Sequence, residues 1–178
     1  MRFFRRKVEV TSYELGKALA AFTFFLSDMN QLKKILRNVG DFVSAREGYL
    51  GNSHKECFMM NMFGVVCACK QTIPSDKCNA VLEAYHIHTQ NRLSYVGWTY
   101  RQIDEFEALL NRRYKDYQQA LRIKNPPGPL YYLGKYAAKH MLAEEYSDNH
   151  YAIKKSSKIF ACTVKAAEKM IRKTYELI

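Results

Sequence analysis

The feature that most constrains this chain is a stretch, residues 57–69, that is apolar on nearly every side of a helix. A helix without a polar face must be enclosed by other elements. Asn61 interrupts the stretch, which would span only about 20 Å as a helix, less than the roughly 30 Å of a bilayer core. We therefore predict a central core helix over residues 54–71, not a membrane span. Its apolar members are Cys57, Phe58, Met59, Met60, Met62, Phe63, Val65 and Val66.

Six further helices are predicted to surround this one. Thr11 with Glu14, and Ser53 with Glu56, have the spacing of a capping box, which marks the start of a helix. The proline-rich stretch 125–129 must end a helix, because proline lacks an N–H donor and restricts its neighbour. Periodicity and these signals place the surrounding helices at about 11–26, 30–46, 75–93, 99–123, 130–142 and 150–178, the last one reaching the end of the sequence.

The expected fold is therefore an all-α, irregular bundle of about seven helices in a single domain, residues 1–178. At 178 residues the chain is long enough to bury one substantial core. Only eight Gly and four Pro leave little turn chemistry for strands, and none is expected. Residues 1–10 form a basic segment that could be flexible.

Positive charge is concentrated in two separate parts of the sequence. The whole chain has a formal net charge of +11. Residues 1–46 and residues 149–178 each carry a net charge of +5, whereas the segment between them is nearly neutral. If the two ends of the chain lie close together, as they often do in domains, their charges would add and attract an acidic partner.

The last predicted helix carries its charge on one side. Its apolar stripe includes Ile153, Phe160 and Ile171, and all basic side chains of the helix fall within an arc of about 100° away from that stripe. These residues are Lys154, Lys155, Lys158, Lys165, Lys169, Arg172 and Lys173. Arg5, Arg6 and Lys7, beside Phe3 and Phe4, offer a second basic element.

Three interpretations of the basic face remain open. It could be a solvated face that favours solubility, a surface for nucleic-acid phosphates, or a contact for an acidic protein or an anionic membrane. The bundle needs the apolar stripe of the same helix, which makes membrane contact the weaker of these. Because lysine acts as a point charge and gives no bidentate readout, nucleic-acid binding would be insensitive to sequence and steeply salt-dependent.

Enzyme-like signals are sparse. Glu83 and His86 have the three-residue spacing that bundle metalloproteins use for ligands, but a di-iron site needs two such motifs and the sequence holds one. There is no glycine-rich phosphate loop and no setting that would activate a cysteine nucleophile. We therefore assign no catalytic residue, cofactor or metal site, and keep Glu83 and His86 as weak metal candidates.

The five cysteines, an odd number, fit a reducing compartment and predict buried, reduced thiols in a cytoplasmic protein.

The function we predict is a non-catalytic helical binding or scaffolding module that could contact nucleic acid without sequence specificity. One alternative is a helical-bundle enzyme or ligand carrier with a pocket near Met59, Met62, Tyr85 and His86. Another is a subunit that associates with its own copies, which the many aromatic side chains permit.

Overall fold

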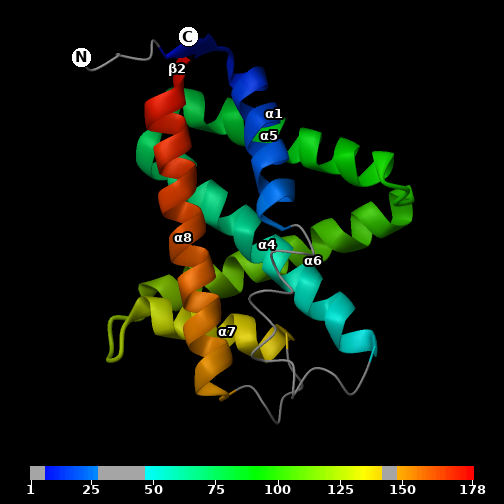
Figure 1. Ribbon diagram of the computed structural model, residues 1–178, viewed down its shortest axis with the longest axis vertical. Coiled ribbons are helices and arrows are strands. Elements are labelled where there is room, and N and C mark those ends of the chain that lie inside the picture. The colour runs from blue at the N-terminus through cyan, green and yellow to red at the C-terminus, as the bar shows by residue number, and fades with distance from the viewer. Residues whose placement is uncertain (1–6, 28–46, 142–147) are drawn as a thin grey trace, which may run out of the picture.

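The computed structural model describes residues 7–27, 47–141 and 148–178, and these fold as an all-α bundle (Figure 1). The helix predicted at about 30–46 and the candidate residues Arg5 and Arg6 lie outside this part of the chain. Within it there are six helices and two short strands. Their bounds are β1 Val8–Val10, α1 Ser12–Leu26, α4 Glu47–Thr72, α5 Ser75–Tyr95, α6 Tyr100–Arg122, α7 Pro129–Met141, α8 His150–Thr174 and β2 Tyr175–Leu177.

The predicted central helix is confirmed as α4, which contacts each of the other five described helices. Its start was predicted wrongly, however, because α4 begins at Glu47 and not near residue 54. Ser53 and Glu56 are therefore interior helical residues, and both are buried. The capping-box spacing was misleading here, since the same two side chains serve contacts with other helices.

Other helix boundaries follow the predicted signals closely. Thr11 and Glu14 form a complete capping box at the start of α1. Thr99 forms another with Gln102 at the start of α6, and Asn149 caps α8 by accepting a hydrogen bond from the Ala152 amide. In each case the cap side chain satisfies an amide that the first turn of a helix leaves without a partner.

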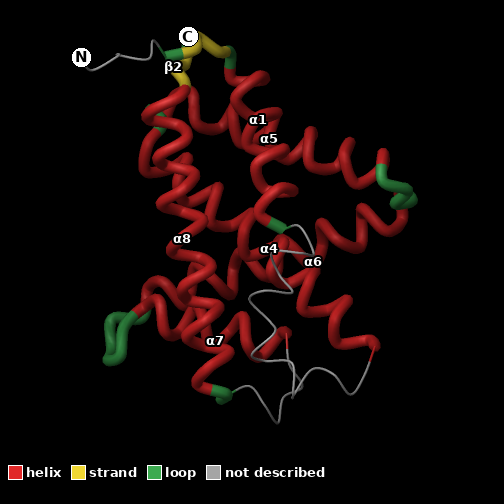
Figure 2. The backbone as a smooth tube through the Cα atoms, viewed as in Figure 1, coloured by secondary structure: helices red, strands yellow, loops and turns green. Residues whose placement is uncertain are grey.

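The two ends of the described chain pair as strands, which was not predicted. α8 stops at Thr174, and β2 runs parallel to β1 with Val8 opposite Tyr175 (Figure 2). Val8 and Val10 have branched side chains that favour extended backbone, and Val10 is buried. The pairing spans only three residues on each side, too few to give a periodic sequence signal. It brings residues 8–10 and the end of α8 together at one pole of the molecule.

Helix α8 runs along the long axis of the molecule and ends at that pole (Figure 1). Its inner side packs against α4 and α7. Gly134 of α7 permits the close approach, because a Cβ at this position would lie 2.4 Å from the Ile153 carbonyl oxygen. The buried residues of α8 are Ala152, Ile153, Ser156, Phe160, Thr163, Ala167 and Ile171.

Across the described residues, no helix combines the length and apolar character needed to cross a bilayer.

Candidate nucleic-acid interface

The outer side of α8 presents a row of cations to solvent. We call this row the basic face, and it consists of Lys154, Lys155, Lys158, Lys165, Lys169, Arg172 and Lys173. Six of the seven are exposed. Lys155 is half-buried, and its ammonium lies 5.1 Å from the centre of the Tyr151 ring. The predicted separation of this face from the apolar stripe therefore holds in the folded helix.

The charge of the basic face is not neutralised within the described part of the chain. None of its seven side chains forms an ion pair with a described carboxylate, and Glu168 is the one acidic residue of α8. Outside the face, Arg101, Arg113 and Lys135 form ion pairs with carboxylates. Other exposed lysines, such as Lys17, Lys115 and Lys124, also have no ion pair with a described carboxylate, but they are not gathered on one side of a helix. Since unpaired neighbouring cations repel each other, the face retains a field that attracts anions.

The structure brings one residue of the N-terminal basic segment to this face. Lys7 and Arg172 line the same pocket beside the β1–β2 pair. Lys77, at the start of α5, reaches the same pole, where its ammonium donates a hydrogen bond to the Leu177 carbonyl oxygen at 3.3 Å. Sequence reasoning missed Lys77 because its position depends on the unpredicted strand pair.

Cys162 lies in the middle of the basic face and was also missed. It is exposed and sits one turn from Lys158 on one side and from Lys165 on the other. All five thiols are free. The prediction that they are buried is confirmed for Cys57, Cys69 and Cys78, holds only in part for the half-buried Cys67, and is wrong for Cys162. Burial raises the pKa of Cys57, Cys67, Cys69 and Cys78. Cys162 is therefore the thiol most accessible to reagents.

The weak metal candidates do not form a cluster. Glu83 is exposed, whereas His86 is half-buried and its Nδ1–H donates to the Leu82 carbonyl oxygen at 2.8 Å. The other ring nitrogen of His86 lies 3.5 Å from the Tyr114 hydroxyl, and burial lowers the pKa of the imidazole. Among the described residues, no three His, Cys, Asp or Glu side chains gather closely enough to hold a metal ion.

The core positions named for a ligand pocket are filled by packed side chains. Met59 and Met62 are each 1% exposed and Tyr85 is fully buried. The Tyr85 hydroxyl is 2.8 Å from the Thr23 hydroxyl, which in turn donates to the Leu19 carbonyl oxygen. This leaves the polar end of the tyrosine satisfied without a ligand.

A polar cluster around the buried Glu56 lies where α4, α6 and α7 meet. Glu56 accepts hydrogen bonds from the Tyr117 hydroxyl and from Arg113 Nε, the latter at 2.9 Å. Asp116 lies 3.8 Å from Arg113 and 3.2 Å from His140 Nε2. Burial raises the pKa of Glu56, although both hydrogen bonds oppose the shift. These groups form hydrogen bonds and ion pairs with one another, and Glu56 is enclosed. We therefore interpret the cluster as a structural contact between the three helices.

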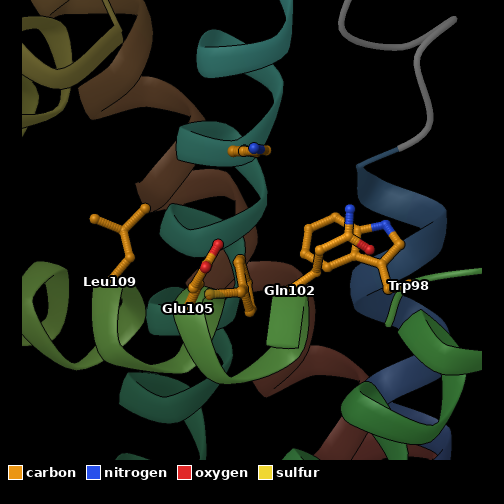
Figure 3. A pocket seen from close by; sticks show the side chains of 6 residues that line it. Trp98, Gln102, Glu105 and Leu109 are labelled. Atoms are coloured by element: carbon orange, nitrogen blue, oxygen red, sulfur yellow. The ribbon is translucent and has the colours of Figure 1, made fainter. Parts of the chain in front are cut away.

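A hollow of about 430 Å³ lies between α4 and the first turns of α6 (Figure 3). Trp98, Gln102, Glu105 and Leu109 line it, as labelled in the view. Two of its polar groups are already engaged, because the Gln102 amide completes the capping box and Glu105 pairs with Arg101. The rest of the lining is the Trp98 indole, the Phe106 ring, Leu109 and the Lys55 side chain, so polar and apolar surface contribute in nearly equal parts.

Comparison with protein-family models, with curated proteins and with solved structures gave no significant match.

Proposed function

We propose that this protein is a non-catalytic helical module that binds nucleic acid through the phosphate backbone, using the basic face of α8. The observation that carries the proposal is the concentration of seven cations on one side of α8, none of which forms an ion pair with a described carboxylate. Lys154 and Lys173 are 19 residues apart, so the basic residues extend over about 28 Å of helix. This length allows several phosphates of one strand to be contacted at once.

The chemistry of the face indicates the kind of binding. Six of its seven cations are lysines, which interact with phosphates as point charges. Such contacts fix a strand without reading its bases. We therefore expect binding that is nearly independent of sequence and that weakens steeply with salt.

The packing of α8 favours nucleic acid over a membrane surface. An amphipathic helix binds a bilayer by burying its apolar side among the lipids. In α8 this side is already buried against α4 and α7. The five free thiols are compatible with the cytoplasm, where nucleic acid is accessible.

The first test is the affinity of the purified protein for labelled mixed-sequence RNA and duplex DNA, measured across a salt series. A plot of log K against log salt should have a slope of several units, since each phosphate contact contributes about −0.7 to −0.9. Absence of binding to either probe at low salt would contradict the proposal. The basic face would then be reassigned to an acidic protein partner or to solubility.

A further inference from the structure

The pocket beside the β1–β2 pair combines features that an extended phosphate-binding face lacks. It has a volume of about 380 Å³ and lies where α1, α4, α5, α8 and the strand pair meet. Ile73, Pro74 and Ile171 form an apolar wall, and Tyr175 adds an aromatic ring. Polar and apolar groups line it in nearly equal parts, and its volume lies within the range of small-ligand sites.

The charged groups of the pocket are of two kinds. Lys7 and Arg172 supply positive charge, and Glu176 supplies a carboxylate. All three are exposed, and within the described chain neither cation forms an ion pair with that carboxylate. The pocket can therefore offer donors to a phosphate and, separately, an acceptor to hydroxyl groups.

The pocket is continuous with the basic face. Arg172 belongs to both, and Lys169 lies one turn earlier on the same side of α8. A strand whose phosphates follow the basic face toward the pole would thus arrive at the pocket. Arg172 and Lys173 are the last cations of the basic face, so its phosphate contacts end at the pocket, which suits a strand that ends there.

We propose that this pocket binds the terminal nucleotide of a single-stranded RNA. The inference rests on the proposed function. Lys7 and Arg172 contact the terminal phosphate, and the carboxylate of Glu176 accepts hydrogen bonds from the ribose hydroxyls. The base lies against Tyr175 and the apolar wall, as unpaired bases do on aromatic side chains in proteins that bind single strands.

The test compares one short RNA, phosphorylated at one end, in linear and in circular form, since the circle then has the same number of phosphates and the same bases but no end. We expect the linear RNA to bind at least five-fold more tightly to the wild-type protein. Lys7→Gln should reduce this preference, because Lys7 contributes to the pocket and lies outside α8. Equal binding of the two forms, with a steep salt dependence retained, would overturn the pocket proposal and leave the proposed function standing.

Glu176→Ala tests the recognition of ribose. We expect this variant to lose the preference for a terminal ribonucleotide over a terminal 2′-deoxynucleotide, because alanine removes the acceptor for the hydroxyls. Glu9→Ala is the matched control: Glu9 is also exposed and pairs with Glu176 in the strand register, but it does not line the pocket. Equal loss of preference in both variants would contradict the assignment of Glu176.

A free nucleoside monophosphate carries the same phosphate, sugar and base. If such a mononucleotide bound as tightly as the linear RNA, the strand-end proposal would be overturned in favour of a free nucleotide as the ligand. Failure of every RNA to bind at low salt would instead remove the proposed function itself, and the pocket inference with it.

Discussion

At the scale of single residues, the pKa of Glu56 is set by two opposing effects. Burial disfavours the charged form and raises its pKa, whereas hydrogen bonds from Tyr117 and Arg113 favour that form. An acid whose pKa is higher in the folded than in the unfolded protein holds its proton more tightly when folded. The free energy of unfolding therefore decreases as pH rises from about 4.5 through the folded pKa of Glu56.

Arg113→Met should destabilise the protein strongly and make its stability more dependent on pH. The substitution leaves Glu56 buried without its cation, which should lower the free energy of unfolding by about 3–5 kcal/mol at neutral pH. Without Arg113 the pKa of Glu56 rises further, so the protonated carboxyl should recover part of the loss near pH 5. Urea unfolding at pH 5 and pH 7 measures this difference.

The double variant Glu56→Gln, Arg113→Met is the control, because the amide removes the buried charge while it keeps a partner for Tyr117. It should be more stable than Arg113→Met alone at pH 7. If Arg113→Met lowered the free energy of unfolding by the same amount at both pH values, the ionisation of Glu56 would not contribute to the effect of the substitution.

These residues also show where sequence reasoning stops. Ser53 and Glu56 have capping-box spacing, and local spacing cannot reveal that α4 already began six residues before Ser53. The partners of Glu56 lie 57 and 61 positions away, at Arg113 and Tyr117. Only the packing of α6 on α4 brings them together, so no local signal could have identified the cluster.

At the scale of elements, α8 shows how much a helical projection can predict. The projection separated the basic arc from the apolar stripe, because both depend only on the 3.6-residue period. It did not predict the end of the helix at Thr174, since Tyr175 becomes extended by pairing with a strand that is distant in sequence. The pocket beside the β1–β2 pair depends on that pairing, so it could not be predicted from the sequence either.

The orientation of α8 makes Cys162 a reporter for the basic face. Exposed thiols react faster than buried ones, and burial raises the pKa of Cys57 and Cys69 to about 12. We expect iodoacetamide to modify Cys162 first, and saturating RNA to slow this reaction by about five-fold or more if the strand covers the face. Mass spectrometry of the modified peptides measures both rates.

Two results would contradict this expectation. Faster modification of a core cysteine would show that α8 does not present Cys162 to solvent. An unchanged rate at Cys162 with saturating RNA would place the bound strand elsewhere on the molecule.

At the scale of the whole molecule, the strand pair connects the distribution of charge in the sequence with its distribution in space. Two basic segments far apart in sequence were predicted to act together only if the ends of the chain were close. Within the described residues, the pairing of Val8 with Tyr175 brings the two ends together and places Lys7 beside the end of the basic face. Composition and periodicity predicted the bundle and its central helix, whereas the pairing of residues 8–10 with 175–177 required the tertiary structure.

The most direct test of the central claim reverses charge on the basic face. Lys158→Glu, Lys165→Glu and Lys169→Glu together remove three exposed cations from α8. The matched control, Lys17→Glu, Lys115→Glu and Lys124→Glu, makes the same change in net charge at exposed sites elsewhere. Circular dichroism should show unchanged helicity in both.

The measurement is the salt dependence of RNA affinity for the two triple variants. If the basic face contacts phosphates, its variant should lose about two orders of magnitude in affinity or more, and its log–log slope should decrease by about 2 units. The control should stay close to the wild type in slope. Equal losses of RNA affinity in the two variants would mean that the affinity depends only on the net charge of the protein, and the assignment of the basic face would be wrong.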